Sequence, residues 1–155
     1  MTKDMRRMPI VLLLLLSLAL LSACGSDKQE QTGGIPYSSK EMRFSLVLPE
    51  SWEGKYVVEE TDDEVLFRSK SNLSWGGVVF QIRAWDKAEW EKDGEEMMKM
   101  THIVKVGEQG NTVFSLSTPS DVQSDINNPE KKQEYSSMHA DIPLIQPSFT
   151  TLNPS

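Results

Sequence analysis

The sequence predicts an α+β domain in which a mostly antiparallel sheet is packed by helices. Three observations carry this prediction: short segments with alternating apolar and polar residues cluster between residues 43 and 85, a helix with a capping signal follows them, and an apolar helical stripe lies near the end of the chain. Strands clustered early, a helix between strands and a closing helix are typical of the α+β class.

The first strand is predicted at 43–48, where Phe44, Leu46 and Leu48 share one face and Pro49 ends the alternation. The same signals predict three further strands at 55–59, 64–69 and 77–85. A turn is expected after the first strand at 52–54, and a loop with Asn72 and Ser74 is expected before the last.

A helix is predicted to follow the last of these strands. Asp86 is a suitable N-cap, and Glu89, three residues on, matches the capping-box spacing. Because Gly94 lowers helix propensity, we expect the helix to end near Met98. A hairpin is then predicted from 102–107 and 111–117, with Val104 and Val106 on one face.

The last element is predicted to be a helix that begins at Asn128-Pro129, an N-cap followed by proline in the first turn. Pro143 interrupts its hydrogen-bond ladder, so a kink or two consecutive helices is expected. Its apolar residues recur at spacings of three and four, which is typical of a buried helical face: Tyr135, Met138, Ile142, Ile145 and Phe149.

Three of these segments resemble the PsbP-like α/β/α sandwich, a domain also carried by small lipoproteins of Gram-positive bacteria. They are the strand-proline-tryptophan element 44–52, the strand 77–83 and the C-terminal amphipathic helix. The resemblance spans about residues 42–150 and implies assembly or accessory roles, mostly non-enzymatic. Fold resemblance does not fix function.

The N-terminus has the three parts of a secretory leader. Lys3, Arg6 and Arg7 form a positive region, and 10–21 is an almost unbroken apolar run. The run has about 12 residues, which suits a signal peptide and is shorter than the roughly 20 that a membrane-spanning helix needs. The segment Leu21-Ser22-Ala23-Cys24 then resembles the lipobox of bacterial lipoproteins.

That resemblance implies transfer of diacylglycerol to the Cys24 sulfur and cleavage before this residue. Cys24 is the only cysteine, so the chain can form no internal disulfide. Two acyl chains give stable anchoring where one does not, so membrane attachment, in the cell membrane and facing the extracytoplasmic side, is expected through lipid on Cys24. An ordinary secretory signal and an uncleaved anchor remain the alternatives.

The predicted organisation has four parts. Residues 25–41 are rich in Gly, Ser, Gln and charged residues, which is typical of a flexible tether. The parts are a signal peptide at 1–23, the lipidated cysteine and tether at 24–41, a single α+β domain at 42–150 and a tail at 151–155.

The charge of the chain disfavours nucleic-acid binding. It carries 16 basic and 23 acidic residues, a net charge of −7, and loss of the leader removes three basic residues and one acidic residue, which gives −9. A domain this acidic repels phosphate backbones and anionic lipid headgroups. We therefore expect no nucleic-acid partner. We expect a protein partner in the cell envelope instead.

No catalytic constellation is evident. Nucleophilic catalysis needs an activated serine or cysteine with a base in reach, and the one cysteine would be consumed by lipid. His102 and His139 are the only histidines, and no serine lies in a G-x-S-x-G elbow. A non-enzymatic protein without a cofactor is predicted, with an unrecognised Ser-His pair as the hydrolase alternative.

The segment 97–102 offers the best candidate metal ligands: Met97, Met98, Met100 and His102. Thioether and imidazole groups favour copper, and a Met-His pair recurs at 138–139. Methionine is also a common filler of apolar cores, which is the favoured interpretation here.

Two further clusters allow more than one interpretation. The acidic run 59–64 could bind Ca²⁺ but lacks the EF-hand spacing, so a solvated hairpin tip is favoured. The four tryptophans could form a stacking platform for a sugar or peptide, or could pack the core, which is favoured: Trp52, Trp75, Trp85 and Trp90.

The sequence therefore favours a lipid-anchored, extracytoplasmic accessory or binding module that presents an acidic domain to an envelope protein. The alternative is capture of copper or a small ligand through the Met/His or Trp groups.

Overall fold

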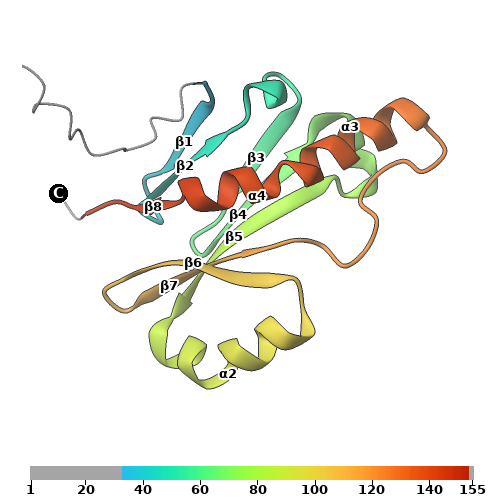
Figure 1. Cartoon of the computed structure of the whole chain (residues 1–155). Coiled ribbons are helices and arrows are strands. Elements are labelled where there is room, and N and C mark those ends of the chain that lie inside the picture. The colour runs from blue at the N-terminus through green and yellow to red at the C-terminus, as the bar shows by residue number, and fades with distance from the viewer. Residues whose placement is uncertain (1–32, 154–155) are drawn as a thin grey trace, which may run out of the picture. The chain divides into compact units, whose positions relative to one another are not determined.

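The structure of the protein is a computed structural model, which describes residues 33–153 and contains two antiparallel sheets (Figure 1). The smaller sheet has the order β1-β2-β8, formed by Ile35–Ser39, Phe44–Leu48 and Thr150–Thr151. The larger sheet has the order β3-β4-β5-β7-β6, formed by Tyr56–Glu60, Glu64–Ser69, Val78–Asp86, Thr112–Ser117 and Ile103–Gln109. The predicted α+β class with a mostly antiparallel sheet is confirmed.

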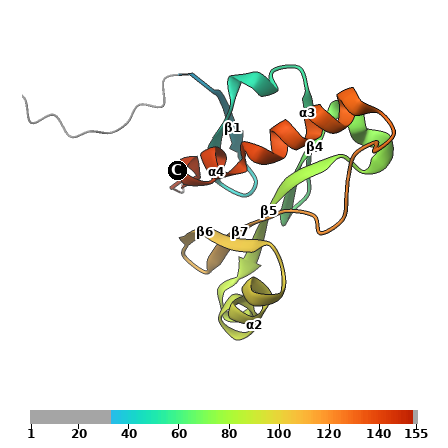
Figure 2. The ribbon, with the colours of Figure 1, turned by 45° about the vertical axis from the view of Figure 1, so that its right-hand side comes forward.

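The helices lie on both sides of the five-stranded sheet (Figures 1 and 2). Helix α2 (Lys87–Met100) packs against β5, β6 and β7 on one side. Helices α3 (Pro129–Ala140) and α4 (Ile142–Ile145) lie on the other side, together with the three-stranded sheet. Three short 3-10 helices complete the described elements: η1 (Glu50–Trp52), η2 (Lys70–Trp75) and η3 (Gln146–Ser148).

The main core lies between the five-stranded sheet and the layer formed by β1, β2, α3 and α4. Alternation along β4 and β5 directs Phe67, Phe80 and Ile82 into this core, where all three are fully buried. The rings of Phe67 and Phe80, which are paired across the two strands, stack with their centroids 4.4 Å apart. Trp52 from η1 closes one end of this core, and its indole nitrogen donates a 2.9 Å hydrogen bond to Asp141.

The C-terminal apolar stripe is helical as predicted as far as Ile145, but Phe149 lies in extended backbone after η3. Asn128 caps α3 by accepting a hydrogen bond from the Lys131 backbone N–H at 3.1 Å. The expected interruption at Pro143 is confirmed as well, because α3 ends at Ala140 and a second helix, α4, begins at Ile142. The stripe faces the core, with four buried residues and one half-buried residue: Tyr135, Met138, Ile142, Ile145 and Phe149.

Strand β7 is buried on both faces, which explains why its apolar residues do not simply alternate. Phe114 and Leu116 face the main core. Val113 and Ser115 face the opposite way, beneath α2, and Ser115 accepts a 2.8 Å hydrogen bond from the Trp85 indole nitrogen. The Trp85 ring in turn lies 5.9 Å from the ring of Trp90, centroid to centroid, and Trp90 attaches α2 to the sheet.

The folded region is longer at both ends than the predicted 42–150. Residues 35–39, placed in the flexible tether by their composition, form β1, which pairs with β2 from Ile35–Leu48 to Ser39–Phe44. At the other end, the predicted tail contains the second residue of β8, and the Leu152 N–H donates to the Arg43 carbonyl. Short edge strands of polar residues carry a weak sequence signal, because pairing partners supply most of their stability.

Four smaller expectations were wrong. A register shift between Lys105 and Gly107 leaves Val106 unpaired, so Val104 is exposed while Val106 packs on the core, and the two do not share a face. Helix α2 continues to Met100, past the expected end. The loop expected around Asn72 is the 3-10 helix η2, and the hairpin turn lies at 110–111 instead of 108–110.

Candidate functional site

The predicted signal peptide at 1–23 and lipidation site at Cys24 lie outside the described residues. Within 33–153, the helices are all too short or too polar to cross a bilayer.

The two histidines are both exposed. His139 lines a cavity of about 370 Å³ between α3 and the segment 119–124, and Ser124 and Ser136 line the same cavity. Among the described residues, neither imidazole takes part in a hydrogen bond, so the structure brings a histidine and serines near one cavity without linking them as a nucleophile and base.

The methionines of 97–102 do not pack together in the core. Met98 is 39 % exposed and Met97 is half-buried, so the core-packing interpretation is wrong for Met98. His102 is exposed just beyond the end of α2. The Met100 side chain lies outside the described part of the structure. Met138, by contrast, is a core residue that is 2 % exposed.

The acidic run forms the tip of the β3–β4 hairpin, as expected, and several of its carboxylates have partners. Glu60 accepts hydrogen bonds from the hydroxyls of Tyr37 and Ser39, which ties β3 to the edge strand β1. Burial and the Glu60 carboxylate raise the pKa of Tyr37 well above its usual value. Glu59 forms an ion pair with Arg68. In the described part of the chain, no cluster of acidic, histidine or cysteine residues is arranged to hold a metal ion.

The four tryptophans do not form one platform. Trp52 is fully buried in the main core, and Trp90 of α2 is 7 % exposed. Trp85 is half-buried and carries the Arg83 guanidinium 4.2 Å above its ring centroid. Only Trp75 among the four has a largely free surface, with 47 % of its area exposed.

Trp75 is one of four exposed apolar side chains on two adjoining segments, which we call the η2 patch. It consists of Leu73 and Trp75 on η2 and of Val122 and Ile126 on the segment that leads into α3; the four side chains are 38, 47, 66 and 58 % exposed, respectively. Isolated exposed apolar residues are common, but several on adjoining segments mark an interaction surface.

A hydrogen-bond network joins these two segments. Asn72 is fully buried, and its side-chain amide donates to the Ser69 hydroxyl and to the Lys131 carbonyl while its oxygen accepts from the Asp125 N–H at 3.0 Å. The Gly77 N–H also donates to the Gln123 carbonyl at 3.1 Å. Asn72 therefore fixes η2, the 122–126 segment and α3 to one another and holds the patch in place.

The cavity that contains His139 adjoins this patch, because Val122 belongs to both. Its wall also contains Tyr135, whose hydroxyl donates to the Val78 carbonyl at 2.7 Å, and burial raises the pKa of that hydroxyl. An apolar rim next to a recess is the surface that a protein partner fills with a side chain.

Sequence reasoning missed the η2 patch. The residues that form it are separated by about 50 positions in the chain, and the buried amide of Asn72 and the Gly77–Gln123 hydrogen bond bring them together. A fully buried asparagine inside a predicted loop carries no distinctive sequence signal.

Comparisons of the chain with protein-family models, with curated proteins and with solved structures give no significant match.

Proposed function

We propose that this protein is a lipid-anchored, extracytoplasmic binding module that presents its acidic α+β domain to a protein partner in the cell envelope, and that it acts by binding instead of catalysis. The observation that supports this function best is the η2 patch, four exposed apolar side chains held on a rigid base by Asn72. Aromatic and aliphatic groups of this kind form the centre of protein–protein interfaces.

The N-terminal sequence supports the location. The positive region, the apolar run and the lipobox-like tetrapeptide that ends at Cys24 favour export and acylation. The PsbP-like resemblance implies the same accessory class. Eight residues of sequence separate Cys24 from Gly33, the first residue that the structure describes, so lipid on Cys24 would keep the domain within reach of the membrane surface.

The anchor is tested in cells with Cys24→Ala in the full chain. Wild type should incorporate acyl label and lose its leader, while the variant should lack label and accumulate as precursor. Equal processing and equal labelling of both chains would refute the anchor.

The partner surface is tested by placing a photo-crosslinking amino acid at position 75 of the full chain in cells. A single adduct of defined mass is expected, and Ile126→Asp, which puts a charge in the patch, should abolish it. The matched control places the crosslinker at Lys92, whose side chain is 79 % exposed on α2, on the opposite side of the five-stranded sheet from α3. Equal adducts from positions 75 and 92, or no effect of Ile126→Asp, would contradict the proposal.

A second candidate function is copper capture at the end of α2. It is supported by the exposure of Met98 and His102, which leaves a thioether and an imidazole free to bind a soft cation. Anaerobic titration with Cu(I) should show one bound ion per chain, and the double variant Met98→Leu/His102→Ala should lose it. Met138→Leu is the control, since this methionine lies in the core. Unchanged copper binding in the double variant would rule out this site.

A further inference from the structure

The end of β5 that lies away from the η2 patch borders a second cavity of about 370 Å³. Its walls come from three turns that are distant in the sequence: the β1–β2 turn at 41–43, the β3–β4 tip at Asp62 and the β6–β7 turn at 109–112. A volume of this size is at the small end of the range for ligand pockets, so it suits a molecule with few heavy atoms.

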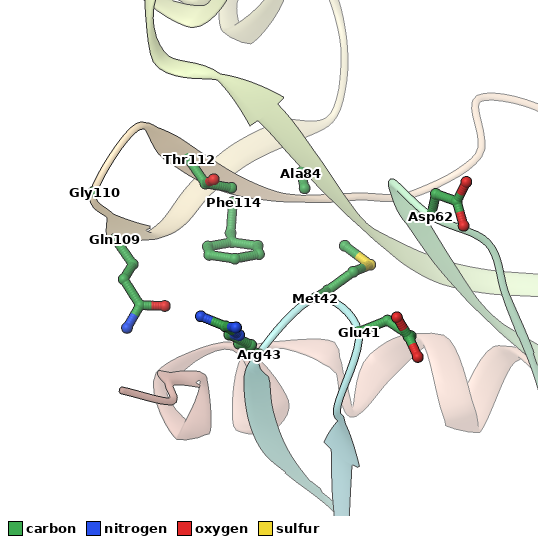
Figure 3. A pocket seen from close by; sticks show the side chains of 9 residues that line it. All are labelled: Glu41, Met42, Arg43, Asp62, Ala84, Gln109, Gly110, Thr112 and Phe114. Atoms are coloured by element: carbon green, nitrogen blue, oxygen red, sulfur yellow. The ribbon is translucent and has the colours of Figure 1, made fainter. Parts of the chain in front are cut away.

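The floor of this cavity is apolar. Phe114 is 2 % exposed and Met42 is 6 % exposed, and both belong to the main core. Ala84 of β5 completes the floor between them, as Figure 3 shows. Apolar floors of this kind bind the hydrocarbon part of a ligand by removing it from water.

One wall of the cavity is cationic and polar. Figure 3 shows the side chains of Arg43, Gln109 and Thr112 on the same side of the cavity, near the Phe114 ring. Within the described part of the chain, Arg43 is not in an ion pair, so its guanidinium is free to bind an anionic group. A guanidinium binds a carboxylate through two parallel hydrogen bonds.

The chain fixes this wall through one peptide segment. Arg43 has a φ of 55°, the only positive φ of a non-glycine residue among the described residues, and its carbonyl accepts a 2.8 Å hydrogen bond from the Leu152 N–H. The Leu152 carbonyl in turn accepts a 2.8 Å bond from the Gln109 side-chain amide. Leu152 therefore holds Arg43 and Gln109 side by side, and it lies about 110 residues from the first of them. Backbone held in this left-handed region is often found at functional sites.

The other wall is anionic. Glu41 and Asp62 lie beyond Met42, on the side away from Gln109, in Figure 3. Both carboxylates are exposed, and neither is in an ion pair within residues 33–153, whereas Glu59 and Asp63 of the β3–β4 hairpin are. The cavity thus places a positive charge at one side, negative charges at the other and an apolar surface between them.

We propose that this cavity binds a small zwitterion with an apolar side chain, in the form of a free amino acid or a short peptide. The ligand carboxylate binds Arg43, its ammonium group binds Asp62 and Glu41, and its side chain covers Phe114 and Met42. This site is separate from the η2 patch, since the two border opposite ends of β5, so it can be tested independently of the membrane anchor and of the protein partner.

The test uses a soluble chain that begins at Gly25, because the compact unit 33–155 contains all of the described core. Calorimetry compares four probes: L-leucine, L-leucyl-L-leucine, L-leucinamide, which lacks the carboxylate, and 4-methylpentanoate, which lacks the amine. At least one of the two zwitterions should bind at least about tenfold more tightly than both of the singly charged probes, because each of these leaves one charged wall without a partner. Whichever of the two zwitterions binds more tightly shows whether the site prefers a free amino acid or a short peptide.

Arg43→Gly is the decisive variant. Glycine adopts positive φ at no cost, so the turn and the hydrogen bond to Leu152 are retained while the guanidinium is lost. Zwitterion affinity should fall at least about tenfold, and Arg43→Lys should recover part of it. Asp62→Asn, on an exposed tip that cannot unfold the core, should weaken the zwitterion and leave 4-methylpentanoate unchanged.

Three results would overturn the site: no heat of binding from either zwitterion up to about 10 mM, equal affinity for all four probes, or zwitterion binding that is unchanged in both Arg43→Gly and Asp62→Asn. None of these depends on Cys24 or on the crosslink at position 75, so failure here leaves the proposed function standing.

Discussion

The two faces of the five-stranded sheet are buried by different means. The face toward β1, β2, α3 and α4 is closed by large apolar side chains drawn from both ends of the described chain, with Phe67, Phe80 and Ile82 fully buried. The face toward α2 is closed by one helix, of which Trp90 and Gly94 are the buried residues in the part described. Ser115, which is polar, lies fully buried beneath it.

This difference indicates how stability is divided. Burial of apolar area gives the core face most of the free energy of folding. The α2 face depends on the buried indole of Trp90, on the hydrogen bond from Trp85 to Ser115, and on the ion pairs of Glu108 with Lys87 and Lys105. Elements with few buried apolar contacts open at lower free energy than the rest, so α2 is expected to open before the main core.

The largest effect is expected in the core face. Phe80→Ala removes a fully buried ring that stacks on Phe67 and leaves a cavity, so the free energy of unfolding should fall by about 3–5 kcal/mol. Urea denaturation followed by tryptophan fluorescence measures this loss. Phe80→Leu, which keeps most of the volume, should cost clearly less. A loss below about 1 kcal/mol for the alanine variant would contradict the assignment of this face as the main core.

The next effect concerns the α2 face. A Cβ at Gly94 would lie 2.7 Å from two fused-ring atoms of the Trp90 indole, so Gly94→Ala should displace the indole and destabilise the protein by about 1–3 kcal/mol. In a Trp90→Ala background the clash is gone, and the same change should stabilise the helix by about 0.5–1 kcal/mol. A double-mutant cycle measured by thermal unfolding gives this change of sign. The same sign in both backgrounds would show that Trp90 does not pack on Gly94.

Removing the N-cap of α2 or of α3 compares the stability of the two faces at a smaller energy scale. Asp86 accepts the Ala88 N–H at 2.9 Å and Asn128 accepts the Lys131 N–H at 3.1 Å, so alanine at either position should cost about 1 kcal/mol locally. Asn128→Ala should lower the global free energy of unfolding because α3 is part of the main core. Asp86→Ala should chiefly speed hydrogen exchange within α2. Equal global losses would show that α2 and α3 unfold together.

The smallest effect is a pH dependence on the α2 side. Hydrogen bonds from Lys105 and Lys87 lower the pKa of Glu108 from 4.5 to about 2, and the same carboxylate raises the pKa of Lys87. Since the folded pKa of Glu108 is below the unfolded one, its contribution is fully present above pH 4.5 and is lost as the pH falls toward 2.

Glu108→Gln should therefore lower the free energy of unfolding slightly at about pH 6.5, and the difference from wild type should vanish near pH 2. Urea denaturation across this range provides the measurement. In the background Lys87→Gln/Lys105→Gln the effect of Glu108→Gln should be absent. A difference that persists unchanged at pH 2 would show that Glu108 acts without its ion pairs.

Local sequence patterns predicted the elements whose stability is local or whose faces are strongly apolar. The strand 64–69 has the predicted bounds, and the cap at Asn128 with the break at Pro143 set α3 and α4 correctly. The candidate binding sites were not predicted. The η2 patch depends on the bonds of Asn72 to Lys131 and Asp125, and the zwitterion cavity depends on Leu152 holding Arg43 and Gln109.

By itself, the sequence determined the fold class, the positions of the strong strands and helices, the acidity of the domain and the presence of a lipobox-like Cys24, because periodicity, capping and charge are properties of neighbouring residues. Only the tertiary structure decided that 35–39 and 150–151 are strands, that Val106 is bulged inward, and which distant side chains share a surface. The physical reason is that these features depend on hydrogen bonds and packing between segments up to about 110 residues apart, whose free energy exists only once both partners are in place.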